Sequence, residues 1–118
     1  MNLKNLTLDE KLTLLTAKNK WETEDLNGKI PNVFMSDGPN GLRRQHMVDG
    51  KWKTVPSIAY PATAVVANTF SKECARILGE SLGDDCIDKQ ADILLAPGVN
   101  IKRTPLCGRN FEYLSEDP

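Results

Sequence analysis

Asp37 and Arg109 are charged residues that each follow a short, mostly apolar run, at 33–36 and 93–96 respectively. If the two runs are parallel strands of one sheet, their C-terminal sides meet at the edge where parallel α/β proteins bind ligands. A carboxylate accepts hydrogen bonds from two neighbouring hydroxyls, and a guanidinium donates hydrogen bonds in a fixed fork. The pair could therefore bind adjacent hydroxyls of a pyranose ring.

The same spacing permits structural interpretations. Asp37 could cap the turn that it begins, and Arg109 could form an ion pair with Glu112 or Glu116. Glu112 and Glu116 are also four residues apart, so on a helix they would share a face, which suggests a catalytic pair of carboxylates as in glycosidases. Nothing in the sequence marks either residue as a proton donor. We therefore interpret both as solvated or as paired with Arg103 and Arg109.

The segment 98–118 contains three basic and three acidic residues together with several turn-forming residues. It lacks the periodicity of a buried helix or strand, so hydrogen bonds and ion pairs must order it, as in a binding loop on a rigid scaffold. Such loops normally lead into another packed element. We expect residues 1–118 to be the front part of a larger protein.

Other candidate residues give weaker signals. His46 is the single histidine and lies in a polar stretch, which favours solvated surface over a catalytic base or metal ligand. The turn 38–41 lacks the Lys-Ser/Thr of a phosphate-binding loop and the third glycine of a dinucleotide fingerprint. Trp21 and Trp52 could stack on a sugar, although packing in the core or at its rim is the commoner role. We expect no cofactor.

The three cysteines are odd in number and lack CxxC spacing, which favours reduced thiols over disulfides or a zinc site. They are Cys74, Cys86 and Cys107.

The elements that would position Asp37 and Arg109 follow from capping and periodicity. Thr7 and Glu10 form a capping box before a helix predicted at 8–17. The alanine- and valine-rich run at 61–70 fits either a helix or a buried strand, and its alanines favour a short helix. Ser71 is a good N-cap for the clearest helix, at 72–88.

Two buried strands, at 33–36 and 93–96, flank that helix in sequence, and the order strand, helix, strand predicts a parallel crossover in an α/β fold. The stretch 38–60 is rich in glycine, proline and charge without periodicity. We predict that it is a long irregular connection.

The composition is that of a soluble globular protein: 118 residues, 40% hydrophobic, 26% charged and a net charge of -1. This balance gives no basic field for nucleic acid or anionic lipid. The N-terminus has no apolar core of signal-peptide length, and no window approaches the length of a membrane span. We expect a cytoplasmic protein without nucleic-acid or membrane partners.

Four motifs together closely resemble the N-terminal part of glycoside hydrolase family 3, and their order and spacing span nearly the whole chain. They are Leu-Thr-Leu-Asp-Glu-Lys at 6–11, Ser-Asp-Gly-Pro-Asn-Gly-Leu-Arg at 36–43, Leu-Ala-Pro-Gly-Val-Asn-Ile at 95–101 and Gly-Arg-Asn-Phe-Glu-Tyr-Leu-Ser-Glu-Asp-Pro at 108–118.

The resemblance implies that residues 1–118 open a TIM-like (β/α) barrel and supply its first strand-helix-strand portion, so that the barrel is incomplete in this chain. It implies that Asp37 and Arg109 bind hydroxyls of the non-reducing terminal sugar. The family's mechanism is retaining hydrolysis by an aspartate nucleophile and a glutamate acid/base. Neither matches a position in this chain, so we expect no catalytic residue here.

The Ser-Asp-Gly-Pro form is similar to the β-glucosidase branch of the family. The implied activity is metal-independent release of terminal glucose from a small β-glucoside or short oligosaccharide. A closed barrel needs about 250 residues, so the chain alone is expected to be inactive and to pair with the remainder of the enzyme or self-associate. The alternative is a non-catalytic carbohydrate-binding or interaction module of the same ancestry.

Overall fold

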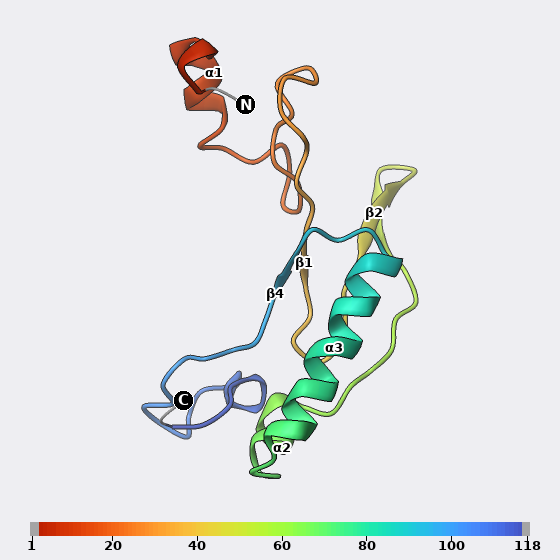
Figure 1. Cartoon of the computed structure of the whole chain (residues 1–118), viewed down its shortest axis with the longest axis vertical. Helices are drawn as coiled ribbons and strands as arrows, with labels where there is room; N and C mark the ends of the chain where they lie inside the picture. The colour runs from red at the N-terminus through yellow and green to blue at the C-terminus, as the bar shows by residue number, and fades with distance from the viewer. Residues whose placement is uncertain (1–2, 117–118) are drawn as a thin grey trace.

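The computed structural model describes residues 3–116, which form an elongated α/β arrangement (Figure 1). The radius of gyration is 17.4 Å and the dimensions are 49 × 31 × 29 Å, whereas a compact domain of this length has a radius of gyration of about 13–14 Å. In the described part of the chain, the buried apolar side chains are Leu6, Leu26, Phe34, Leu42 and Leu82. These side chains lie on well-separated segments and form only a small core.

A two-stranded parallel sheet joins β1 (Met35–Asp37) to β4 (Ile93–Leu95), with Ser36 opposite Leu94. The long helix α3 (Lys72–Asp88) separates these strands in sequence and runs beside them in space (Figure 1). The predicted parallel crossover and the α/β class are therefore confirmed.

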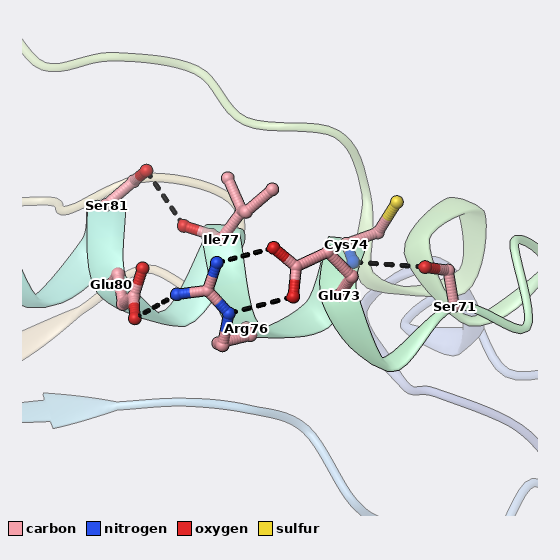
Figure 2. A network of polar contacts seen from close by, with 7 residues as sticks. All are labelled: Ser71, Glu73, Cys74, Arg76, Ile77, Glu80 and Ser81. Carbon is pink, nitrogen blue, oxygen red and sulfur yellow. Dashed lines mark hydrogen bonds and ion pairs between the residues drawn. The ribbon is translucent and has the colours of Figure 1, made fainter.

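Helix α3 forms because Ser71 caps it and ion pairs line its exposed side. The Ser71 hydroxyl accepts a hydrogen bond of 3.2 Å from the Cys74 amide, satisfying one orphan donor of the first turn. Arg76 pairs with Glu73 one turn before it and with Glu80 one turn after it (Figure 2). The bounds agree with the prediction of 72–88.

The predicted helix 8–17 is wrong in its second half, because α1 covers only Leu8–Thr13. Its start is as predicted. The Thr7 hydroxyl accepts a hydrogen bond from the Glu10 amide, and the Glu10 carboxylate accepts one from the Thr7 amide. At the other end, Thr13 and Thr16 donate their hydroxyls to backbone carbonyls. Such bonds compete with helix continuation, and the chain leaves through tighter turns.

The expectation of an irregular 38–60 connection is also wrong in part, because β2 (Gln45–Val48) and β3 (Lys51–Thr54) form an antiparallel hairpin. Its two-residue turn is Asp49-Gly50, and both residues have positive φ, at 50° and 72°. This dipeptide is a strong hairpin signal.

The short helix predicted within 61–70 is confirmed as α2 (Thr63–Ala67), and the chain reverses after it, with Phe70 at a φ of 51°. No helix among residues 3–116 is long and apolar enough to cross a membrane.

Candidate functional site

Asp37 is the last residue of β1, and a tight loop returns the chain to it. The Asp37 carbonyl accepts the Arg43 amide at 2.8 Å, and the two residues form an antiparallel bridge. Among the described residues, no hydrogen bond reaches the Asp37 carboxylate. The backbone of Asp37 thus closes the loop, while its carboxylate stays available to a ligand.

Two glycines are required by this loop. Gly38 and Gly41 have φ values of 133° and 135°. A Cβ at Gly38 would lie 2.0 Å from the Gly41 carbonyl oxygen, and one at Gly41 would lie 2.2 Å from the Ile58 carbonyl oxygen. Any side chain at either position would displace the backbone that follows Asp37.

Arg109 comes to the same edge because the segment after β4 loops out and returns. Gly98 and Tyr113 form a parallel bridge, and the Leu114 amide donates to the Gly98 carbonyl at 3.2 Å. Arg109 directly precedes the short helix η2 (Asn110–Glu112) within this returning segment. The bridge therefore returns the segment that carries Arg109 to the residues that follow β4.

The electrostatics connect the two residues. The Glu112 carboxylate, hydrogen-bonded to Arg109 Nε, is the main cause that raises the pKa of Arg109, and the charges of Glu112, Tyr113 and Asp37 raise it further. The ion-pair alternative for Arg109 and Glu112 thus holds, and Arg109 also lies within electrostatic reach of Asp37. Since the Arg109 side chain is 71% exposed and the bond uses only Nε, the terminal nitrogens can donate to a ligand.

No family model matches the chain. Three curated relatives each match 98–99% of it. Thermostable β-glucosidase B of Acetivibrio thermocellus is 42% identical to the chain, and β-glucosidase B of Emericella nidulans is 47% identical. An exo-α-(1→6)-L-arabinopyranosidase of Bifidobacterium longum is 37% identical. The β-glucosidase of Kluyveromyces marxianus, solved in complex with glucose, superposes with a TM-score of 0.86 at 39% identity, covering 98% of this chain and 14% of that one. The GH3 β-glucosidase of Bifidobacterium adolescentis gives 0.83 at 38% identity, covering 98% and 16%. Along nearly its whole length, the chain is similar in sequence and fold to glycoside hydrolase family 3 β-glucosidases.

The chain spans only 13–16% of the length of the curated relatives named above. The similarity itself extends over nearly all of this chain.

The two tryptophans pack around a lysine. Lys20 Nζ lies 4.6 Å from the Trp52 ring centroid and 5.1 Å from that of Trp21, and it donates to Gln45 Oε1 at 2.8 Å. Cation–π contacts of this kind occupy ring surfaces that a sugar would need. The arrangement favours rim packing over a sugar platform, and His46 is exposed on the neighbouring strand β2.

Sequence reasoning missed Arg43, which is exposed and lies beside Asp37 through the bridge that closes the loop. A glycine at each end of a short turn was the available signal, since such a turn returns the next residues to its starting point.

The cysteines and acids form no metal centre within the described part of the chain. No group of three or more His, Cys, Asp or Glu side chains within residues 3–116 could hold a metal ion. All three cysteines are free thiols, and burial, followed by the charge of Asp85, raises the pKa of Cys86. A thiol in this state is a poor nucleophile.

Proposed function

We propose that residues 1–118 are the opening part of the catalytic barrel of a longer β-glucosidase, in which Asp37 and Arg109 bind the terminal sugar. One arrangement carries the proposal: β1 and β4 pair in parallel with Asp37 at the carboxyl end of β1, and the Gly98–Tyr113 bridge returns the segment that contains Arg109 to the residues after β4. The family supports the reaction class, since relatives along the whole chain are named β-glucosidases.

An incomplete barrel accounts for the apolar surface of the sheet. Ile93 and Leu95 on β4 are 45% and 52% exposed, although such strand residues are normally buried on both faces of a parallel sheet. A cavity of about 340 Å³ also lies between α3 and β4, with Leu78, Leu82 and Leu94 in its wall. The remainder of the enzyme is the partner that would cover both.

The contribution of this segment to catalysis would be to bind and orient the sugar. Ionised Asp37 would accept hydrogen bonds from two neighbouring hydroxyls, and the terminal nitrogens of Arg109 would donate to a hydroxyl oxygen beside them. Such contacts fix the ring so that its anomeric carbon meets the reacting groups. The nucleophile and the acid/base belong to the rest of the polypeptide, and the reaction needs no cofactor.

The first experiment identifies the native polypeptide, meaning the product in the source cell that contains residues 1–118, by its intact mass. A product several times larger than 13.1 kDa supports the proposal. A product of 13.1 kDa overturns it in favour of a carbohydrate-binding module. Calorimetry with glucose or cellobiose then decides that alternative, because a genuine module binds sugar saturably and loses binding on Asp37→Ala.

The second experiment assays the native polypeptide with 4-nitrophenyl β-D-glucopyranoside and, because one relative is an arabinopyranosidase, with the α-L-arabinopyranoside. We expect Asp37→Ala to lower kcat/KM about 100-fold, since it removes two hydrogen bonds to a charged group. Asp88→Asn, at an exposed ion pair with Lys89, is the control and should leave the rate unchanged. Absence of hydrolysis by the unaltered protein would refute the proposed activity.

A further inference from the structure

The loop that follows Asp37 is fastened at Asn40. The Asn40 carbonyl accepts the Tyr60 amide at 2.9 Å. Its side-chain Oδ1 accepts both the amide and the hydroxyl of Thr63, each at 3.2 Å. Thr63 is buried, at 3% exposure, and is the first residue of α2. A side chain from a distant loop thus satisfies an orphan amide at the start of that helix.

Tyr60 extends this connection to α3. Its hydroxyl donates a hydrogen bond of 3.0 Å to Asp85 Oδ2 and also lies 3.4 Å from the Ser81 carbonyl oxygen. Asp85 faces inward at 9% exposure. A buried carboxylate needs a donor, because water no longer solvates it, and Tyr60 supplies one. A continuous series of hydrogen bonds therefore runs from Asp85 through Tyr60 to Asn40.

The Tyr60 hydroxyl stays protonated and so keeps donating its hydrogen bond to Asp85. Burial is the main cause that raises the pKa of Tyr60, followed by the hydrogen bond to Asp85 and the charges of Asp85 and Asp84. The hydroxyl thus keeps its proton over the working range of pH and remains a donor. The Tyr60 tether, defined as Asn40, Tyr60, Thr63 and Asp85, joins the Asp37 loop to the longest helix of the described chain.

We propose that Tyr60 and Asp85 are positioning residues that act through Asn40 to hold Asp37 in place for the sugar. The inference rests on the proposed function, because it concerns the geometry of a sugar ligand. Gly41 adds to the argument: its backbone sits so close to Ile58 that a Cβ would lie 2.2 Å from the Ile58 carbonyl oxygen. A shift of the segment 58–63 therefore moves the loop behind Asp37.

The test uses three variants of the native polypeptide. Tyr60→Phe removes only the hydroxyl, and Asp85→Leu removes its acceptor while keeping the branching of the side chain. Asp85→Asn keeps an oxygen that can accept the same hydrogen bond and so should rescue the function. Arg76→Gln removes exposed ion pairs on α3 that are expected to contribute little, and it serves as the control.

Two measurements are made on each variant: kcat and KM for the aryl β-glucoside, and hydrogen exchange of peptides covering 37–63. We expect Tyr60→Phe and Asp85→Leu to raise KM about three- to tenfold, the effect of one lost hydrogen bond. The value of kcat should stay within about twofold, because a mispositioned Asp37 weakens ground state and transition state alike. Exchange should rise in the same peptides, and Asp85→Asn and Arg76→Gln should behave like the unaltered protein.

The outcomes separate the two proposals. Faster exchange with unchanged KM would mean that the Tyr60 tether is structural only, and it would overturn the positioning role. Unchanged exchange and unchanged KM would overturn the tether itself. Absence of hydrolysis in the unaltered protein would instead refute the proposed function, whatever exchange shows.

Discussion

The Asp92 carboxylate accepts the backbone amide of Phe34 at 2.8 Å, across 58 positions of sequence. The Phe34 carbonyl in turn accepts hydrogen bonds from the amides of Asp92 and Ile93, at 3.0 and 3.1 Å. These bonds lie at the N-terminal end of the parallel sheet, where Met35 of β1 and Ile93 of β4 form the first pair. They align the two strands whose carboxyl ends carry the candidate site.

Asp92→Ala should therefore loosen the start of the sheet. We expect a loss of about 1 kcal/mol in the free energy of unfolding, the usual net value of one hydrogen bond, measured by urea denaturation of the native polypeptide. Asp92→Asn keeps an acceptor oxygen and should recover most of the loss. Equal stability of the alanine variant and the unaltered protein would show that backbone pairing alone sets the alignment.

Arg109→Lys keeps the positive charge but loses the planar fork of donors. Because the geometry of the proposed sugar contact depends on that fork, we expect KM for the aryl β-glucoside to rise about tenfold or more. The measurement is steady-state kinetics of the native polypeptide. A lysine variant with unaltered KM would indicate that Arg109 acts only as the partner of Glu112.

Gly41→Ala should weaken sugar binding, because the added Cβ would meet the Ile58 carbonyl oxygen at 2.2 Å and displace the loop behind Asp37. Gly50→Ala is the matched control: its φ is 72° and the added Cβ meets nothing within 4 Å. The control should lose about 1 kcal/mol of stability through backbone strain and keep its KM. If both variants have the same KM, the close approach at Gly41 has no bearing on the site.

Helix α1 should weaken in acid. The hydrogen bond from Lys29 is the main cause that lowers the pKa of Glu10, with the Thr7 amide next. A lowered pKa in the folded state means that the stabilisation is complete above the ordinary value of 4.5 and disappears as the pH falls through the folded value. The protection of the amides of residues 8–13 against hydrogen exchange, taken relative to the unfolded chain at the same pH, should fall between neutral pH and pH ~3, and Glu10→Gln should remove this dependence.

Residues 1–118 made alone should self-associate, since β4 exposes Ile93 and Leu95 and has an unpaired edge in the described chain. Sedimentation velocity over a range of concentrations should show oligomers. Leu95→Lys should reduce them, whereas Leu106→Lys, in the loop after β4 and 91% exposed, should have a smaller effect. A monomer with a sharp two-state melt would contradict this expectation.

The parts of the fold that sequence predicted are those fixed by local signals. Ser71 and the apolar spacing after it defined α3, and the short runs around Ser36 and Leu94 gave the parallel pair. The errors came from competing local chemistry: the hydroxyls of Thr13 and Thr16 ended α1 early. The hairpin was overlooked because its Asp49-Gly50 turn lay within a stretch without clear alternation.

The site divides in the same way. Topology alone predicted that Asp37 and Arg109 end up at one edge of the sheet, and the structure brings them into electrostatic reach of each other. Their role as sugar ligands stays a prediction. The Tyr60 tether was not predictable, because Tyr60 and Asp85 are separated by 25 positions and meet only through tertiary packing.

The unpaired edge of β4 also matters while the protein is being synthesised. In the longer protein proposed above, a ribosome adding about 5–20 residues per second needs about 2–6 s to make the roughly 30 residues of one further strand-helix-strand unit. During that interval, Ile93 and Leu95 would face the crowded cell without a strand on the open edge of β4. The nascent enzyme would then depend on chaperones, or on a pause-free stretch of codons just downstream, to keep its first two strands from pairing with a neighbour.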